Sequence, residues 1–290
     1  MSIKSIKLVE NKFIKYREEL NGVIYLAKLA GTIMIKDYDQ NYNIEQKQEN
    51  VAPEASIITE VDAKIDSLVQ FYFSRIWPDD SLLTEETKAA QDWHKARRIW
   101  IVDPIDGTMG YKKQTGSFGI SIALIEDGRP ALGILYAPDL KLMAIGVKDE
   151  GSYLNNKFID LSNAYSLNNI ICSSNAYQRE PYQKALSQLN PDHKLGLITM
   201  ESVVVKAIRL LQKRGEIYPV LPLSDEVQSV PKFWDVAAAD IIIHEAGGLV
   251  TDFSGQKYKY DQPDFRCKNG VIMGTQKGHQ YAIDKMKSKL

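Results

Sequence analysis

Two aspartates stand three positions apart in the segment IWIVDPIDGTMGYKK, which covers residues 99–113. Four apolar, β-prone residues precede Asp103, so Asp103 is expected at the C-terminal end of a buried strand. Pro104 fixes its own φ angle and lacks an N–H, so it turns the chain and lets Asp106 point back toward Asp103. The Ile105 carbonyl is expected to face the same place. Burying carboxylates without a cation is costly. Either a positive side chain elsewhere in the chain must pair with these acids, or the segment must bind a cation.

The chemistry of this segment depends on which cation it holds. Clustered carboxylate and carbonyl oxygens, without histidine or thiolate, favour a hard cation, above all Mg²⁺ held at about 2.1 Å. Gly107 and Thr108 follow, and a helix beginning there would offer amides and a hydroxyl to an anion, for which phosphate is the natural candidate. The alternative is an acidic turn without function, since Asp, Pro and Gly are all turn residues.

Two further acidic segments favour the metal site. LLTEET places Glu85 and Glu86 at the end of a second apolar strand. KFWDVAAADIIIHEAGG places Asp235 at the start of a helix, where we expect it to be the N-cap. Taken singly, the two glutamates would be surface acids and Asp235 would be a helix cap, so only the combination argues for metal.

Helical spacing dominates the N-terminal part of the chain. Apolar residues recur at helical intervals from about residue 6 to 34 and indicate one or two amphipathic helices, interrupted near Gly22 or Gly31. A polar loop is expected over 37–53, and a second helix over 61–76. Both helical segments precede the first strand pattern of the chain.

The period then changes to that of strands. Buried strands are expected at 81–86 and 98–102, a hairpin at 117–137, and a further meander at 142–154. From residue 168 onward strands and helices alternate. The expected strands are IICSS, EIYPVL, LVTDF and GVIMG, and the expected helices cover 180–189, 202–214, 235–246 and the C-terminal end.

This pattern predicts an α/β (α+β) protein in two halves. Residues 1–165 form an N-terminal α+β half with most of the candidate metal ligands, and residues 166–290 form a C-terminal α/β half with Asp235 and the substrate contacts. The join is expected near residues 160–168.

Composition excludes several classes of protein. Lys plus Arg total 36 and Asp plus Glu total 37, a net charge of -1, so a nucleic-acid polymer is not an expected partner. The chain has no apolar run near the roughly 20 residues needed to span a bilayer, and no signal peptide, so a cytoplasmic protein that does not bind a membrane is expected.

Other motifs in the sequence do not indicate a different site. The glycine-rich GTMGYKKQTGSFG lacks the GK[ST] of a P-loop. Scattered histidines and two cysteines without CxxC give no other metal or disulfide pattern: His94, His193, His244, His279, Cys172 and Cys267.

The order of the acidic segments resembles a known family. DPIDGT, the EE pair before it, and the later WD with AAA and EAGG are similar in order and spacing to the inositol monophosphatase superfamily of metal-dependent, lithium-sensitive phosphatases. The resemblance covers roughly residues 55 to 275 and implies a layered αβαβα fold like that of fructose bisphosphatase.

The resemblance also implies roles for individual residues. Asp103 would bridge two of two or three Mg²⁺ ions, and Thr108 would orient the attacking water together with Glu85. TEVD resembles the short T-x-x-D stretch of the family, which makes Asp62 an acid near the water-activating site. The implied metal ligands are Glu85, Asp103, the Ile105 carbonyl, Asp106 and Asp235. The implied substrate contacts are Asp106, Gly107, Thr108, Ser174, Asn175, Lys206 and Asp235.

Within the superfamily, DPIDGTMGYKK and the hairpin after it look closest to the 3'(2'),5'-bisphosphate nucleotidases. Inositol monophosphatases usually have asparagine at the position of Gly110, and often an inositol-contacting acid at the position of Gln228. Lys206 matches a nucleotidase lysine that can pair with the second phosphate. On the residues alone, a solvated helix lysine is the alternative.

This chain also departs from the nucleotidase pattern. Asn175 stands where a histidine often contacts the nucleotide, and Met109 stands where a lysine is common. The turn before Lys206 reads TMES instead of a Gly-Ser-rich sequence. These departures concern nucleotide preference and leave the acidic set intact.

The leading hypothesis is a Mg²⁺-dependent phosphatase that removes the 3'-phosphate of adenosine 3',5'-bisphosphate. The alternative is an inositol-1-monophosphatase or another small sugar-phosphate phosphatase. A hypothesis of another class is a non-catalytic module that binds a phosphorylated metabolite. The expected partner is a small phosphorylated metabolite, and the chain is expected to be a monomer or a homodimer.

Overall fold

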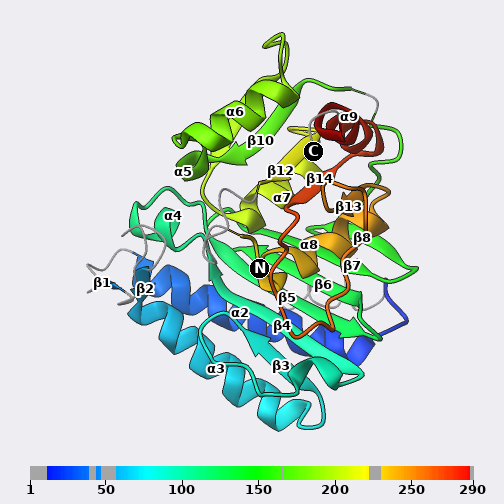
Figure 1. Cartoon of the computed structure of the whole chain (residues 1–290). Helices are drawn as coiled ribbons and strands as arrows, with labels where there is room; N and C mark the ends of the chain where they lie inside the picture. The colour runs from blue at the N-terminus through cyan, green and yellow to red at the C-terminus, as the bar shows by residue number, and fades with distance from the viewer. Residues whose placement is uncertain (1–11, 39–43, 47–56, 165, 222–229, 288–290) are drawn as a thin grey trace.

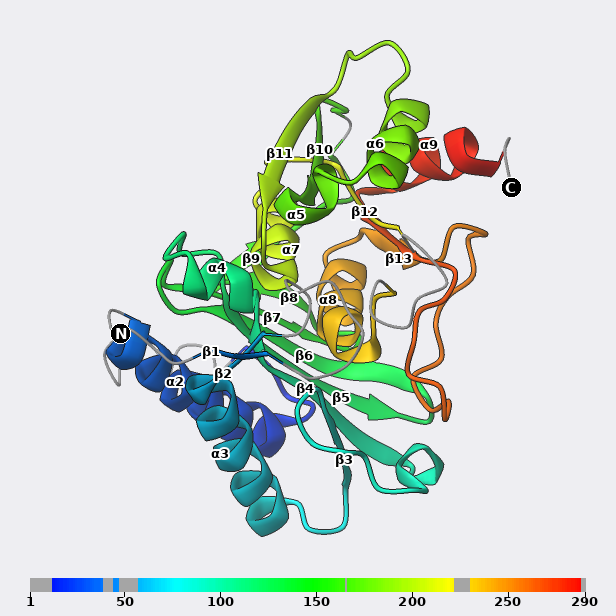
Figure 2. The same cartoon turned by 60° about the vertical axis from the view of Figure 1, so that its left-hand side comes forward.

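The structure is a computed structural model of the 290-residue chain, and it describes residues 12–38, 44–46, 57–164, 166–221 and 230–287 (Figure 1). The described elements stack in five layers, in which helices and sheets alternate (Figure 2). This arrangement is the predicted layered αβαβα fold, so the predicted fold class is confirmed. Among the described helices none has the length and apolar content needed to cross a bilayer.

The larger sheet has seven strands in the order of the chain, from β3 to β9. Only the pair β3 and β4 is parallel, and every other neighbouring pair is antiparallel. Strands β5 and β6 are apolar and buried along almost their whole length, as expected for a sheet with helices on both faces. The strands are β3 (Ser81–Thr84), β4 (Arg98–Asp106), β5 (Gly119–Glu126), β6 (Arg129–Ala137), β7 (Leu142–Val147), β8 (Gly151–Leu154) and β9 (Lys157–Ile159).

Helices α2 (Arg17–Tyr38) and α3 (Glu60–Ile76) cover the outer face of this sheet. The predicted interruption near Gly22 or Gly31 is wrong, because α2 runs through both glycines. A Cβ on Gly22 would lie 2.6 Å from the Trp77 ring, and one on Gly31 would lie 2.5 Å from the Tyr136 ring. The two glycines therefore serve close packing rather than a break.

The smaller sheet has five strands in the order β11, β10, β12, β14 and β13, and it lies beyond a layer formed by α7 and α8. Helices α6 and α9 cover its other face. The strands are β10 (Asn169–Ser173), β11 (Gly196–Met200), β12 (Ile217–Val220), β13 (Leu249–Thr251) and β14 (Val271–Gly274). The helices are α6 (Glu180–Leu189), α7 (Val203–Leu211), α8 (Phe233–Glu245) and α9 (Gln276–Lys287).

Short elements complete the described chain. They are β1 (Ile44–Gln46), β2 (Ile57–Thr59), the 3₁₀ turn η1 (Trp93–Lys95), α4 (Thr108–Lys112) and α5 (Ser174–Tyr177). The predicted loop over 37–53 is wrong where it can be compared, since residues 37 and 38 belong to α2 and residues 44–46 form β1. Strands β9 and β11 were not predicted.

The two predicted halves share a core. Helix α8 comes from the C-terminal half, yet it packs on β5, β6 and β7 of the larger sheet. A Cβ on Gly133 would lie 2.7 Å from the Ala238 carbonyl oxygen, and one on Gly146 would lie 2.7 Å from the Ile242 Cα. These glycines let the helix approach the sheet closely, which places the start of α8 over the end of β4. The division at residues 165/166 stays a prediction.

Candidate metal and phosphate site

The strand that carries Asp103 does not end at Val102 as predicted, because β4 continues to Asp106 through a β-bulge. Asp103 pairs with Ser121 and Asp106 pairs with Gly119, so three steps on β4 face two steps on β5. In a regular strand, residues three apart point to opposite faces, and the extra residue brings Asp103 and Asp106 to one face. Pro104 lies inside this bulge and has no N–H to leave unpaired.

Glu85 reaches the same place through the parallel pairing of β3 with β4. Thr84 stands opposite Val102 in the register, so the next residue, Glu85, comes out level with Asp103. The negative charge of Glu85 acts on Asp103 and is one cause of a raised Asp103 pKa. The glutamate is exposed, whereas Asp103 is only 1% exposed.

Asp235 approaches from the opposite side, on α8. Its predicted N-cap position is wrong: Lys232 is the N-cap and Asp235 is the third helical residue. Its carboxylate still accepts from the Lys232 N–H, at 2.6 Å, as an acid in a capping box does. The Ser121 hydroxyl donates to the Trp234 carbonyl at 3.1 Å, and this bond ties the start of α8 to the strand beside Asp103.

The three aspartates form a cluster of ligand oxygens. One carboxylate oxygen from each of Asp103, Asp106 and Asp235 lies within 4.8 Å of the others. Asp103 Oδ1 is buried and has no hydrogen-bond partner among the described residues. A buried carboxylate with an orphaned oxygen, beside two further acids, fits a hard divalent cation, because one cation can bind oxygens from all three.

Burial and mutual repulsion raise the pKa values of these acids. The pKa of Asp103 lies well above its ordinary value, first because of burial and then because of Glu85, Asp106 and Asp235. Burial also raises the pKa of Asp106, and it raises the pKa of Asp235 to about 6. A site that disfavours its own charged forms is stabilised when a cation enters.

Asp106 is joined to helix α7 in addition to the cluster. Its Oδ2 accepts from the Ser202 hydroxyl and, at 2.6 Å, from the Val204 N–H. Ser202 is the N-cap of α7, and its hydroxyl oxygen also accepts from the Val205 N–H at 3.1 Å. One oxygen of Asp106 therefore fixes the helix that carries Lys206.

Three further predicted residues of the site are the catalytic candidates Asp62 and Thr108 and the substrate contact Gly107. Asp62 is buried in the first turn of α3, and its negative charge contributes to the raised pKa of Asp103. Gly107 has a φ of 84° and precedes α4, with Ser117 and Ser202 so close that no Cβ would fit. The Thr108 hydroxyl donates to the Ile105 carbonyl at 3.2 Å. Thr108 therefore lies beside the predicted carbonyl ligand.

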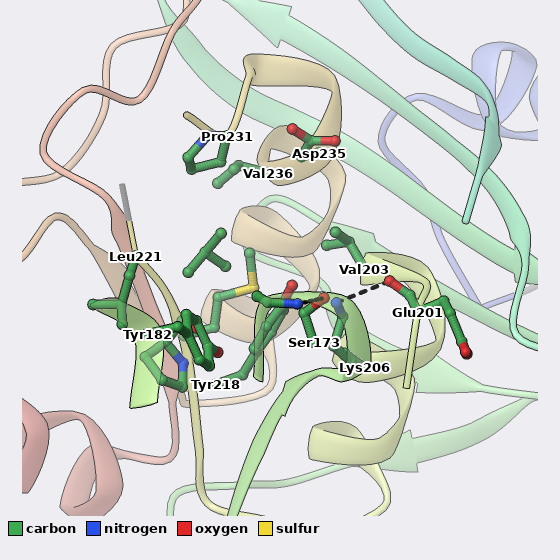
Figure 3. Close-up of a pocket in the computed structure, with 14 residues that line it drawn as sticks. Ser173, Tyr182, Glu201, Val203, Lys206, Tyr218, Leu221, Pro231, Asp235 and Val236 are labelled. Atoms are coloured by element: carbon green, nitrogen blue, oxygen red, sulfur yellow. Dashed lines mark hydrogen bonds between the residues drawn. The ribbon is translucent and has the colours of Figure 1, made fainter. Parts of the chain in front are cut away.

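A cavity of about 200 Å³ opens beside Asp235 (Figure 3). Asp235 and Lys206 both line this cavity, and Lys206 lies close to Tyr218, while Tyr182 and Leu221 form a part of the wall away from Asp235. A small molecule with one anionic end and one flat or apolar end would match this distribution.

Lys206 is buried, so the alternative interpretation of this residue as a solvated helix lysine is wrong. It is 2% exposed, its Nζ donates to the Glu201 carbonyl at 3.0 Å, and it lies 5.1 Å from the Tyr218 ring centre (Figure 3). Burial lowers the pKa of Lys206 to about 8, and the negative charges of Asp106 and Asp235 oppose that shift.

The other predicted substrate contacts are less close to the cavity. Ser173, rather than Ser174, lines it, together with Ala176. The side chain of Asn175 and the whole of Gln228 lie outside the described residues. The predicted substrate residues that line the cavity are therefore Lys206 and Asp235.

Several residues of the site were not foreseen. Ser202 could have been noticed as a serine directly before the apolar run VVVKAIRLL, a common N-cap pattern. Ser121, Tyr182 and Tyr218 carry no local signal, because strand pairing and helix packing alone bring them to the site.

The layered fold and the oxygen-only cluster fit a metal-dependent phosphoric monoester hydrolase, and the comparisons with known proteins show that class. The family model of the inositol monophosphatase family matches residues 15–288. The chain belongs to the inositol monophosphatase family, whose members are Mg²⁺-dependent and act on small phosphorylated metabolites. The predicted superfamily is confirmed.

Individual relatives differ in their activities. The chain is 27% identical over 261 residues to a fructose-1,6-bisphosphatase/inositol-1-monophosphatase of Thermotoga maritima, covering 88% of this chain and 93% of the relative. It is 30% identical over 253 residues to the 3'(2'),5'-bisphosphate nucleotidase CysQ of Salmonella typhimurium, covering 83% and 93%. Its fold matches staphylococcal inositol monophosphatase-1, solved as an inhibitory complex after soaking in lithium chloride, with a TM-score of 0.79, 18% identity and coverage of 96% and 97%.

Proposed function

We propose that the chain hydrolyses the 3'-phosphate of adenosine 3',5'-bisphosphate. The observation that carries this proposal is Lys206, a buried cation that shares a cavity with Asp235. A substrate with a single phosphate can be bound at the acids through metal alone, whereas a second phosphate needs a separate positive group. Lys206 provides that group, and the apolar wall of Tyr182 and Tyr218 suits a flat base. The similarity to CysQ points in the same direction.

Each residue of the acidic set has a proposed task. Glu85, Asp103, Asp106, Asp235 and the Ile105 carbonyl would hold the Mg²⁺ that the reaction needs. When bound there, Mg²⁺ supplies positive charge to the phosphoryl oxygens and lowers the pKa of bound water.

The remaining residues act on the water and the phosphoryl group. Thr108 and Glu85 orient the attacking water, and Asp62 adds a buried acid beside them. The backbone N–H groups of Gly107 and Thr108 donate to the phosphoryl oxygens, where charge must be stabilised in the transition state. The resemblance also implies substrate contacts for Ser174 and Asn175.

A second candidate is an inositol-1-monophosphatase or another sugar-phosphate phosphatase. The similarity to the Thermotoga maritima enzyme favours it, because that relative is named as both a fructose-1,6-bisphosphatase and an inositol-1-monophosphatase. The TMES turn, which differs from the nucleotidase pattern, also favours this candidate.

A substrate panel tests the proposal. Phosphate release is measured with Mg²⁺ on adenosine 3',5'-bisphosphate, inositol 1-phosphate and fructose 1,6-bisphosphate, each with and without lithium. The proposal expects the highest kcat/KM on the adenosine bisphosphate, and inhibition by lithium. A clear preference for inositol 1-phosphate or the sugar would overturn it. Mg²⁺-independent binding of these compounds without any turnover would instead favour a non-catalytic module.

A further inference from the structure

The loop that carries Glu85 needs support from outside the acidic cluster. Glu85 follows the end of β3, the edge strand of the larger sheet, and its side chain is exposed. Before any cation arrives, Glu85 and Asp103 repel each other, since the charge of Glu85 is a cause of the raised pKa of Asp103. Something must therefore hold this loop in position against that repulsion.

The supporting contacts come from α3, which packs against β3 and β4 (Figure 2). The Thr87 hydroxyl donates to Asp66 Oδ2 on this helix. The Thr87 N–H donates to the Thr84 hydroxyl at 3.2 Å, and Gln70 reaches the same hydroxyl at 3.4 Å. Thr84 and Thr87 bracket Glu85, so both ends of its loop are tied to one helix.

The burial of Asp66 is expensive for the fold. The residue is 6% exposed, and its Oδ1 is buried with no hydrogen-bond partner among the described residues. A carboxylate with one hydroxyl partner and one orphaned oxygen stabilises a fold poorly, and an apolar side chain would serve packing better. A buried polar group with an unsatisfied oxygen is more typical of a functional site than of a structural core.

The position of Asp66 on its helix suggests that task. Asp66 lies one turn after Asp62, so both carboxylates are on one face of α3 and both are buried. Asp62 and Glu85 each act on Asp103, but they come from different elements. The bond from Thr87 to Asp66, together with that from Gln70 to Thr84, fixes the Glu85 loop relative to the helix of Asp62.

We propose that Asp66 and Thr87 are positioning residues that hold Glu85 ready for Mg²⁺. They touch neither the substrate nor the ion and act through the geometry of the loop from Thr84 to Thr87. This inference rests on the proposed role of Glu85 as a metal ligand. Partners of this outer kind typically contribute about 10-fold to 100-fold in metal affinity or activity.

The test measures Mg²⁺ binding to the full chain by calorimetry, with no substrate present. Thr87→Val removes the hydroxyl at constant volume and should weaken Mg²⁺ binding about tenfold. Thr87→Ser keeps the hydroxyl and should restore the affinity of the wild type. Ser67→Ala is the matched control, because Ser67 lies on the exposed side of the same helix and donates only to the Ala63 carbonyl.

Variants of Asp66 separate positioning from a direct charge effect. Asp66→Asn keeps an acceptor for the Thr87 hydroxyl and should bind Mg²⁺ within about threefold of the wild type, well below the usual loss for an outer partner. Asp66→Ala should match Thr87→Val, and the double variant Asp66→Ala with Thr87→Val should be no weaker than either alone, since both remove one bond. Thermal unfolding without Mg²⁺ identifies any variant that is simply misfolded, in which case Thr87→Ser against Thr87→Val decides.

Several outcomes would overturn the inference. Wild-type affinity in Thr87→Val would do so, as would losses that add in the double variant. Asp66→Asn as weak as Asp66→Ala, together with a normal Thr87→Val, would indicate that Asp66 acts by its charge. A wild-type chain that binds no Mg²⁺ would remove the proposed function as well, so the two failures are distinguishable.

Discussion

The hydroxyl of Ser202 donates to Asp106 Oδ2, and this bond joins an acid of the larger sheet to the first turn of helix α7. Asp106 lies in the metal cluster, and α7 carries Lys206 into the cavity. The bond therefore couples the two ends of the site, which come from different halves of the chain. Both residues are buried, so water does not compete for it.

Ser202→Ala should lower both the stability of the chain and its affinity for Mg²⁺. Loss of the N-cap costs about 1 kcal/mol of unfolding free energy, and the freed Asp106 should bind Mg²⁺ about tenfold less tightly. Urea unfolding and Mg²⁺ calorimetry measure the two effects. Ser187→Ala, which removes an exposed hydroxyl bond on α6, is the control and should change neither. Unaltered Mg²⁺ affinity in Ser202→Ala would contradict the coupling.

Asp103→Asn should abolish turnover while leaving the chain folded. Without Mg²⁺ the variant should melt no lower than the wild type, because the substitution removes repulsion from a buried acid whose pKa is already raised. Added Mg²⁺ should raise the melting temperature of the wild type but not of the variant, since ligand binding stabilises only the state that binds. Asp127→Asn, in the exposed turn between β5 and β6, is the control. Near-normal phosphate release by Asp103→Asn would show that Asp103 is not a metal ligand.

Lys206→Met should separate substrates with one phosphate from those with two. Methionine fills the same buried space without the charge, so KM for adenosine 3',5'-bisphosphate should rise about tenfold or more, equivalent to roughly 1.4 kcal/mol. KM for inositol 1-phosphate should change much less. Equal changes for both substrates would show that Lys206 serves the fold or the metal cluster rather than a second phosphate.

Gly110→Ala should destabilise the segment after the DPIDGT motif. A Cβ at this position would lie 2.2 Å from the Ser117 carbonyl oxygen, a backbone atom that cannot turn away. Overpacking of this kind costs about 1 to 3 kcal/mol, to be measured by urea unfolding. A larger asparagine should cost at least as much. A variant with wild-type stability would show that α4 shifts freely.

His279 should make stability fall on the acid side of neutrality. Thr251 donates its hydroxyl hydrogen to the Asp252 carbonyl at 2.8 Å, so the neutral His279 ring donates from Nε2 to the Thr251 oxygen at 2.7 Å. Burial lowers the pKa of His279 to about 4, below the ordinary value of 6.5. The unfolded chain therefore binds more protons between these values, and stability is full above pH 6.5 and is lost as pH falls toward 4.

The loss attached to His279 amounts to as much as about 3 kcal/mol. His279→Gln keeps a donor near Nε2 but does not titrate, so its unfolding free energy should depend less on pH over this range. Urea unfolding between pH 4 and pH 7.5 measures the two slopes. Identical slopes for the variant and the wild type would mean that other groups control acid unfolding.

Sequence patterns predicted much of this molecule because they depend on neighbouring residues. Helical spacing located α3 and α6, alternating and apolar runs located β3 to β8, and the DPIDGT motif with its companion acids identified the family. Short edge strands such as β9 and β11 were missed, because three to five residues with exposed side chains carry little periodic signal.

What the sequence determined by itself is the set of acids and the chemistry that clustered oxygens support. Their convergence was decided by tertiary structure. The bulge in β4 turns Asp103 and Asp106 to one face, the parallel register brings Glu85 level with them, and glycines in the sheet let α8 place Asp235 opposite. The burial of Lys206 and the bonds from Ser202 to Asp106 and from Thr87 to Asp66 were likewise decided there. They join residues far apart in the chain, and only packing brings such residues together.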